Sequence, residues 1–383
     1  MIAGRTQQIS PFLAMEVLEA AQEIDPTGTE VIHLEVGEPD FPTPEPIKDA
    51  ALRAIRENRT RYTHSMGLLP LREAIAEHFH KTYGVSISPD QILVTAGTSP
   101  ALLLICLALC EPGDEVILTD PCYACYPNFV RVAGAQPVFV PIYEEEGFQL
   151  TAEAVRRHLT PRTKAILINS PANPTGTLLS PEHMAALVEL GPIVISDEIY
   201  HGLVYEGQEH SILEFTDRAF VLNGFSKAYA MTGWRLGYVV GPRSAMRALQ
   251  TLHQNFFISA NEFVQWAAVA ALRDCQEYRI QMRDTFNARR RFLIPELRRL
   301  GFGVATEPTG AFYVLANARR FTTRSYEFAM EILREAKVGV TPGIDFGQNG
   351  EGYIRFSYAN SLERIQQALE RLEGFLRRTG RIS

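Results

Sequence analysis

Between residues 92 and 240, short apolar runs alternate with segments of helical periodicity, and this alternation is the strongest constraint on the fold. Short runs without polar alternation are typical of strands that are buried on both faces of a sheet. The runs occupy residues 92–95, 115–119, 137–142, 165–169, 193–196, 219–222 and 236–240. Strands that alternate with helices predict an α/β fold whose mostly parallel sheet is covered on both sides. Ligands of such folds bind at the carboxyl ends of the strands, so functional residues are expected there.

The segments on either side of this region have a different pattern. Ser10 and Pro11 predict the start of a helix that continues to Ile24, because serine caps helices and proline fits their first turn. Residues 37–44 contain too much glycine and proline for a helix or a central strand. Further helices are expected at 45–57, 69–83, 275–300, 325–337 and 362–378, and further strands at 311–315 and 353–357. The last of these elements predict an α+β lobe at the end of the chain.

Composition and charge exclude several classes of partner. Of the 383 residues, 46% are hydrophobic and 21% are charged, as in globular enzymes. The net charge of −7 comes from interspersed acidic and basic residues, so neither nucleic-acid binding nor membrane-surface binding is expected. The longest apolar stretch, 101–110, is too short to span a bilayer, and the first residues lack the pattern of a signal peptide. We therefore expect a cytoplasmic protein.

The five cysteines are an odd number, which favours reduced thiols in an unsecreted protein. Cys122 and Cys125 form a C-x-x-C pair. A zinc site would need two further ligands, and the sequence has no second pair, so no metal is expected. The pair is either a redox centre or two small apolar residues in a loop.

A lysine follows one of the apolar runs with no acidic neighbour to neutralise it. Lys227 lies in the segment 223–237, which reads Asn-Gly-Phe-Ser-Lys-Ala-Tyr-Ala-Met-Thr-Gly-Trp-Arg-Leu-Gly. A desolvated ammonium group tends to lose its proton, and a neutral lysine amine can form a Schiff base. The alternative is a surface lysine in a Ser/Gly loop, and the segment alone does not decide between the two.

Two turns at strand ends are suited to the polar parts of a ligand. Gly97, Thr98 and Ser99 lie between a strand and a helix, where free N–H groups, a positive helix end and two hydroxyls suit a phosphate. An ordinary capped helix would have the same sequence, and the spacing matches neither a nucleotide P-loop nor a dinucleotide site. Asn173 presents an amide between two prolines at the same edge, or it simply belongs to a turn.

Two charged residues on strands are further candidates. Asp197 and Glu198 are neighbours on an extended chain and face opposite ways, so only one carboxylate points into a given site and a metal pair is not expected. Asp197 is expected to be partly buried and to need a cationic partner. Arg355, in a strand of the last lobe, is either a bidentate clamp for a carboxylate or an exposed edge residue.

Together, these groups match one cofactor, pyridoxal 5'-phosphate, which has a phosphate, a pyridine nitrogen and an aldehyde. The chain resembles the class I/II aminotransferases of the aspartate aminotransferase superfamily over nearly its whole length. The most specific motifs are Ser-Lys-Ala-Tyr-Ala-Met-Thr-Gly-Trp-Arg at 226–235 and Asn-Pro-Thr-Gly at 173–176, joined by Asp-Glu-Ile-Tyr at 197–200 and Gly-Glu-Pro-Asp-Phe at 37–41. The resemblance implies the aspartate-aminotransferase-like fold, with a large domain at 45–280 and a small domain formed by 1–44 and 281–383.

The resemblance also implies a role for each candidate in cofactor binding. Lys227 would form the Schiff base and then act as base and acid, and Asp197 would pair with the pyridine N–H⁺. Tyr123 would stack on the ring, and Tyr200 would bond to its oxygen together with Asn173. The remaining implied phosphate contacts are Gly97, Thr98, Ser99, Ser226, Arg235 and, from the neighbouring subunit, Tyr62.

The substrate would be held by residues from both ends of the chain. Arg355 would clamp the substrate α-carboxylate, with Asn173 and the Gly37 backbone nearby. The implied activity moves an amino group between an L-amino acid and a 2-oxo acid, with 2-oxoglutarate as the expected acceptor, by ping-pong kinetics. The shared phosphate contact of Tyr62 implies a homodimer.

Two departures from the family pattern concern specificity. Many relatives have a phosphate-binding serine where this chain has Gly224, and some dicarboxylate-preferring relatives have a lysine where this chain has Ser99. Apolar or aromatic substrates are therefore included in the expected range. Phe256 and Phe257 are a weak indication of this, and the alternative is that both belong to the core. A carbon–sulfur β-lyase on the same fold is the alternative enzyme. A cofactor-sensing regulator is the alternative without catalysis, and that class usually carries a DNA-binding extension.

Overall fold

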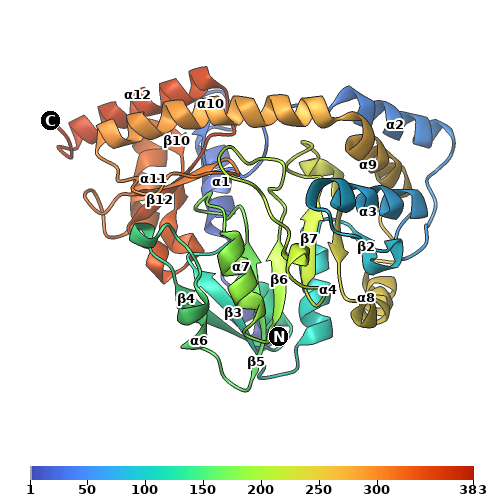
Figure 1. Cartoon of the computed structure of the whole chain (residues 1–383). Helices are drawn as coiled ribbons and strands as arrows, with labels where there is room; N and C mark the ends of the chain where they lie inside the picture. Colours follow the sequence, from blue (N-terminus) through green and yellow to red (C-terminus); the bar gives the residue numbers. More distant parts are fainter. Residues whose placement is uncertain (1) are drawn as a thin grey trace.

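The computed structural model describes residues 2–383, and its central element is a seven-stranded mixed sheet (Figure 1). The order of its strands is β2-β8-β7-β6-β5-β3-β4. Strands β3 to β7 pair in parallel, whereas β8 is antiparallel to both of its neighbours, β7 and β2. The strands of this sheet are β2 (Ile92–Thr95), β3 (Glu115–Asp120), β4 (Gln136–Pro141), β5 (Thr163–Asn169), β6 (Ile193–Asp197), β7 (Phe220–Gly224) and β8 (Gly237–Val240). The predicted α/β fold with a mostly parallel sheet is confirmed.

Each face of the sheet has its own hydrophobic core, as continuous apolar strands require. In β5, Ile166 and Ile168 belong to one cluster, whereas Ala165 and Leu167 belong to the other. The second cluster includes buried residues of α4, α5 and α8, and the first includes residues of α3, α7 and α9. The helices are α1 (Leu13–Ile24), α2 (Glu45–Arg56), α3 (Leu69–Tyr83), α4 (Thr98–Leu109), α5 (Tyr126–Val132), α6 (Ala152–Arg156), α7 (Pro181–Val188), α8 (Arg243–Phe256), α9 (Glu262–Asp274), α10 (Gln276–Leu300), α11 (Ser325–Ala336) and α12 (Leu362–Arg378).

The two ends of the chain come together beside the main sheet. Strand β1 (Ile32–His33) pairs in parallel with β10 (Val338–Gly339), and β11 (Thr341–Pro342), β12 (Tyr353–Ser357) and β9 (Tyr313–Asn317) form an antiparallel sheet. The 25-residue helix α10 runs along the molecule from α9 to this C-terminal part, a length of about 40 Å (Figure 1). The pairing of β1 with β10 joins the N-terminal and C-terminal segments, and the domain boundaries expected above stay a prediction.

The predicted start of α1 is wrong. The helix begins at Leu13, and Phe12 at its N-cap position provides no side-chain cap. Ser10 instead bonds through its backbone to Asn128 of α5, with Ser10 N donating to Asn128 Oδ1 at 3.2 Å. The first free N–H groups of α1 donate to the carboxylate of Asp345, which lies in a 3₁₀ turn at Gly343–Phe346.

The remaining sequence expectations concern metals, thiols and membranes. All five cysteines are free, and burial raises the pKa of the Cys122 and Cys125 thiols, which disfavours the reactive thiolate. Within residues 2–383 there is no cluster of three or more His, Cys, Asp or Glu side chains suited to a metal ion. In the same part of the chain, no helix combines the length and the apolar character needed to cross a membrane.

Candidate active site

A cavity of about 300 Å³ opens at the carboxyl ends of β5 and β6. Segments far apart in the sequence line it, including α1, the N-terminus of α4, the loop after β7, and strands β9 and β12. The predicted site residues that line the cavity are Gly37, Thr98, Ser99, Tyr123, Asn173, Asp197, Tyr200, Ser226, Lys227, Arg235 and Arg355. Gly97 is adjacent to the Arg235 guanidinium but does not line the cavity. Tyr62 is 80% exposed and also lies outside the cavity.

Lys227 enters the cavity from the loop that follows β7. Its Nζ donates a hydrogen bond to Gly37 O at 2.6 Å. Burial lowers the pKa of Lys227 to about 8, an effect that the Glu38 carboxylate opposes and that Arg235 and Arg355 reinforce. A substantial fraction of this amine is therefore neutral near physiological pH, as a nucleophilic lysine requires. The geometry favours the reactive amine over the surface lysine.

Asp197 lies at the end of β6, on the floor of the same cavity. Its Oδ2 accepts a hydrogen bond from Tyr126 Oη at 2.7 Å, and its Oδ1 accepts one from Ile199 N at 3.2 Å. Burial nevertheless raises the pKa of Asp197 to about 6. Both donors are neutral, so they leave a buried carboxylate that a cation would stabilise further. A protonated pyridine nitrogen fits this requirement.

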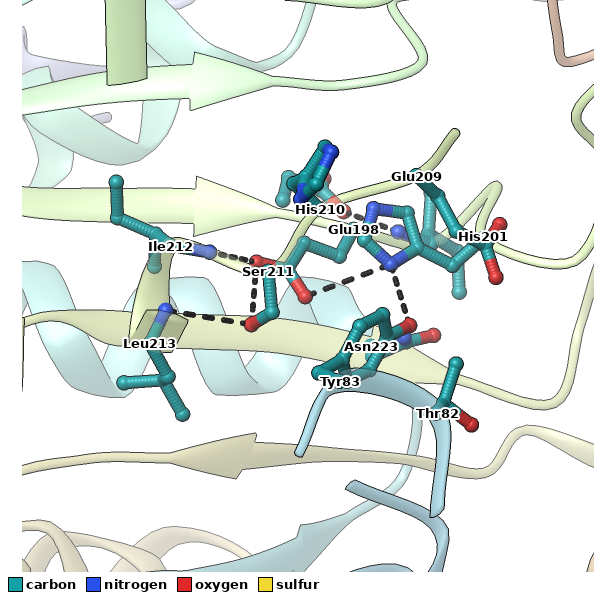
Figure 2. A network of polar contacts seen from close by, with 12 residues as sticks. Thr82, Tyr83, Glu198, His201, Glu209, His210, Ser211, Ile212, Leu213 and Asn223 are labelled. Carbon is teal, nitrogen blue, oxygen red and sulfur yellow. Dashed lines mark hydrogen bonds and ion pairs between the residues drawn. The ribbon is translucent and has the colours of Figure 1, made fainter. Parts of the chain in front are cut away.

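Glu198 faces away from the cavity, as the alternation of an extended chain predicts. Its Oε1 accepts hydrogen bonds from Ser211 Oγ at 3.1 Å and Ile212 N at 3.0 Å (Figure 2). His201 lies between Glu198 and Tyr83, 2.7 Å from Tyr83 Oη and 3.6 Å from Glu198 Oε2. This buried network holds the turn that carries Asp197 and Tyr200. It lies on the side of the turn that faces away from the cavity and does not line the cavity.

An anion cradle is formed where Arg235 meets the N-terminus of α4. Thr98 and Ser99 begin this helix, whose N-cap residue, Gly97, offers no side-chain cap, so the first N–H groups are free for a ligand. A methyl group on Gly97 would lie 2.7 Å from Arg235 Nη2, and its φ of +103° disfavours any other residue. The absence of a side chain at Gly97 therefore brings the guanidinium up to the helix end, an arrangement that fits a phosphate.

The structure also explains the glycine at position 224. A Cβ there would lie 3.0 Å from both Gly237 Cα and Leu236 O, because β7 and β8 pack closely at this point. There is little room for the serine that many relatives carry. Ser226, two residues later, lines the cavity and offers a hydroxyl from the same loop.

Replacing Gly97 with alanine is expected to weaken binding of pyridoxal phosphate about tenfold, because the methyl group displaces a charge-assisted donor. Gly191→Ala is the matched control, since its φ of +100° imposes the same backbone strain and no atom lies within 4 Å of the position its methyl would take. The dissociation constant of each apoprotein for the cofactor, from fluorescence quenching, measures the effect. Unchanged affinity in Gly97→Ala would contradict the cradle.

Arg355 is 2% exposed and held by residues from three segments. Its Nη1 donates to Asn173 Oδ1 at 2.9 Å, and its Nη2 donates to Thr341 Oγ1 at 3.0 Å and to Glu35 O. Its Nε is buried and has no hydrogen-bond partner within residues 2–383. An oriented guanidinium with a free donor at a cavity wall fits a carboxylate ligand, and it is not the exposed edge residue that the sequence left open.

Two tyrosines that contact the predicted site residues were missed by the sequence reasoning. Tyr126 bonds to Asp197, and it follows Tyr123 by three residues, a spacing that places both rings on one side of a turn. Tyr313 bonds to Tyr200 through their hydroxyls at 3.0 Å and lies under the Arg355 guanidinium at 4.3 Å. The β9–β12 register places Tyr313 diagonally across from Arg355, which the two predicted strands alone did not reveal.

Comparison with known proteins identifies the family. The family model for aminotransferases of class I and II matches residues 29–372. The chain belongs to this family. A (5-formylfuran-3-yl)methyl phosphate transaminase of Methanocaldococcus jannaschii is 43% identical to this aminotransferase, over 98% of this chain and all of that protein. Aromatic-amino-acid aminotransferase 2 of Thermococcus litoralis is 35% identical, over 98% of each chain.

The solved structures agree with the family. Aspartate aminotransferase from Thermus thermophilus with maleate superposes with a TM-score of 0.94 at 38% identity, over 98% of this aminotransferase and all of that chain. The class I and II family uses pyridoxal phosphate, and the buried Asp197, the free lysine amine and the anion cradle fit its three functional groups. The comparisons favour an aminotransferase over the carbon–sulfur lyase that the sequence left open.

Proposed function

We propose that this aminotransferase moves an amino group from an L-amino acid with a large apolar or aromatic side chain to 2-oxoglutarate, by a ping-pong mechanism. The observation that carries the proposal is the placement of Lys227 Nζ in one cavity with Asp197, Arg235 and Arg355. An amine, a buried carboxylate and two guanidinium groups are the set that amino-group transfer through pyridoxal phosphate requires.

Each residue has a physical role in this proposal. When bound, pyridoxal phosphate supplies a protonated ring that stabilises negative charge at the substrate α-carbon. Asp197 keeps the ring nitrogen protonated, and the Arg235 cradle holds the phosphate. Arg355 and Asn173 bind the substrate α-carboxylate, which orients the α-proton. Lys227 Nζ would take that proton from the α-carbon and return it to the cofactor carbon, and its lowered pKa raises the fraction of the amine that is neutral and able to act as a base.

The apolar part of the cavity wall supports apolar substrates. Phe12, at the N-cap of α1, and Met15 and Leu18 within the helix line the cavity, and Met15 is 45% exposed. Ser99 offers no charge to a distal carboxylate, which is consistent with a preference other than aspartate. The α-carboxylate of 2-oxoglutarate would bind Arg355 in the second half-reaction, as the donor does in the first.

We also propose a homodimer in which Tyr62 reaches the phosphate of the neighbouring site. Tyr62, Phe256 and Ile258 are 80%, 56% and 49% exposed. The Tyr62 loop adjoins the segment after α8 through a hydrogen bond from Thr63 N to Ser259 Oγ at 3.2 Å. Exposed apolar side chains gathered in this way favour an interface between proteins. A monomeric mass in solution would contradict this proposal.

A panel of amino acids tests the function. Enzyme loaded with pyridoxal phosphate is mixed with one amino acid at a time, without acceptor, and the absorbance change follows conversion of the cofactor to its amine form. We expect efficient conversion by phenylalanine and leucine and poor conversion by aspartate, because the α1 wall is apolar. Release of pyruvate and ammonia from cystathionine, without conversion by any amino acid, would overturn the proposed activity.

A further inference from the structure

The first turn of α1 is held in place by a residue more than three hundred positions away. Leu13 N donates to Asp345 Oδ1 at 2.9 Å, and Ala14 N donates to Asp345 Oδ2 at 3.1 Å. The first N–H groups of a helix need acceptors, and Phe12 at the N-cap position supplies none. A carboxylate at this end also interacts favourably with the helix dipole. Asp345 is therefore the cap of α1, supplied from another part of the chain.

The turn that carries Asp345 is itself fixed to the frame of the active site. Phe346 O accepts a hydrogen bond from Cys122 N at 2.8 Å, one residue before the proposed ring-stacking Tyr123. Ile344 N donates to Ser325 Oγ at 3.1 Å. The cap thus connects α1 to the segment on which the cofactor ring is expected to rest, and the turn that carries it has hydrogen bonds of its own to Cys122 and Ser325.

The part of α1 that Asp345 holds is the part that faces the substrate. Phe12, Ala14, Met15 and Leu18 line the cavity, and the Phe12 ring packs edge-on against Tyr123 with centroids 5.8 Å apart. On another face of the helix, Val17 and Ala21 are buried against Leu333. Loss of the cap would therefore loosen the first turn and the apolar wall, while that packing keeps the rest of the helix docked.

We propose that Asp345 is a positioning residue that sets selectivity for large apolar substrates, by capping α1 and holding the Phe12–Met15–Leu18 wall in the cavity. This inference rests on the proposed function, because the wall matters only for a substrate that is large enough to reach it. Asp345 does not line the cavity, so it would act on the apolar wall through α1. Its charge also interacts with Arg355, an effect that would change the KM of every substrate alike.

The first test is steady-state kinetics of the enzyme loaded with pyridoxal phosphate. In Asp345→Ala we expect the KM for L-phenylalanine to rise about fivefold, the ratio that corresponds to a helix cap of about 1 kcal/mol. The kcat for L-phenylalanine should stay within about twofold of the wild-type value. The KM for L-alanine should also stay within about twofold, because a methyl side chain does not reach the wall. An equal rise for both substrates, or no rise, would overturn the proposal.

Ser361→Ala is the matched control, because Ser361 caps α12 by accepting a hydrogen bond from Arg364 N at 3.2 Å. It removes a cap from another helix and should lower the melting temperature without changing either KM. Asp345→Asn, which keeps the shape but accepts only one of the two N–H groups, should fall between wild type and Asp345→Ala.

Hydrogen exchange separates failure of this inference from failure of the proposed function. If the wild-type enzyme does not convert L-phenylalanine, the proposed substrate class is wrong, and the cap is judged on exchange alone. We expect the amides of residues 13–18 to exchange about fivefold faster in Asp345→Ala, but not in Ser361→Ala. Unchanged exchange in Asp345→Ala would overturn the proposal whatever the substrate.

Discussion

Replacing Lys227 with methionine should abolish transamination and, at the same time, stabilise the apoprotein. Turnover should fall by about 10⁴-fold or more, because both the covalent link to the cofactor and the group that moves the α-proton are lost. Burial lowers the pKa of Lys227 from 10.5 to about 8. Below pH 8 the folded protein therefore holds an ammonium group in a desolvated position, which costs up to about 3 kcal/mol relative to the unfolded chain.

The sign of the stability change follows from proton binding. Between pH 8 and 10.5 the unfolded chain binds more protons at this lysine than the folded protein does, so the cost shrinks as the pH rises through this range. The variant also leaves Gly37 O without its hydrogen-bond donor, and this loss reduces the gain in stability by about 1 kcal/mol. We expect a net gain of about 2 kcal/mol at pH 7 and almost none at pH 9.5.

Urea unfolding of the apoproteins at the two pH values measures this gain. Lys48→Met is the matched control, because the Lys48 side chain is 37% exposed and pairs only with an exposed glutamate. Its turnover should be unchanged and its stability should change by less than about 0.5 kcal/mol. Normal turnover in Lys227→Met would refute the assignment of the enzyme, and a loss of stability at pH 7 would show that Lys227 is not desolvated.

The residues that the sequence identified are those whose chemistry conflicts with their position. Lys227 and Asp197 are charged groups at the ends of apolar strands, so local pattern alone marked them as candidates. The strands themselves were predictable because the sheet is covered on both faces, and a strand that is buried on both faces has a continuous apolar run. The free donor of Arg355 depends on contacts from three segments, which no local pattern contains.

The contacts that were missed join positions distant in sequence through side chains common in any core. Tyr126 and Tyr313 look like ordinary buried aromatics until the fold brings them to Asp197 and Arg355. The start of α1 was predicted wrongly for a related reason. Ser10 has the local features of a cap, but its backbone is tied to α5, and the actual cap comes from Asp345. Local propensity is overridden where a tertiary partner satisfies the same groups better.

Asp197→Asn is expected to lower turnover by about 10²- to 10³-fold with little change in the fold, because a neutral amide no longer keeps the pyridine nitrogen protonated. Cofactor affinity should also lose part of its pH dependence. Burial raises the pKa of Asp197 to about 6, so in the wild type the carboxylate becomes neutral, and its attraction for a cationic ring is lost, as the pH falls through 6. The phosphate of the cofactor titrates in the same range, so the comparison is between the two proteins across pH 5 to 8.

Glu198→Gln is the control that separates contact with the cofactor ring from packing at the end of the strand. Both variants replace a buried carboxylate with its amide at adjacent positions of the same strand end, but Glu198 points into the network of Ser211, Ile212 and His201 on the far side (Figure 2). The Glu198→Gln variant should lose about 1–3 kcal/mol of its free energy of unfolding, because the network is buried. Its turnover should stay within about fivefold of the wild-type value. If Glu198→Gln loses as much turnover as Asp197→Asn, the effect of Asp197 comes from packing at the end of β6 and not from contact with the ring. The alternation of two neighbouring side chains thus predicts which carboxylate meets the cofactor ring and which one only supports the turn from the far side.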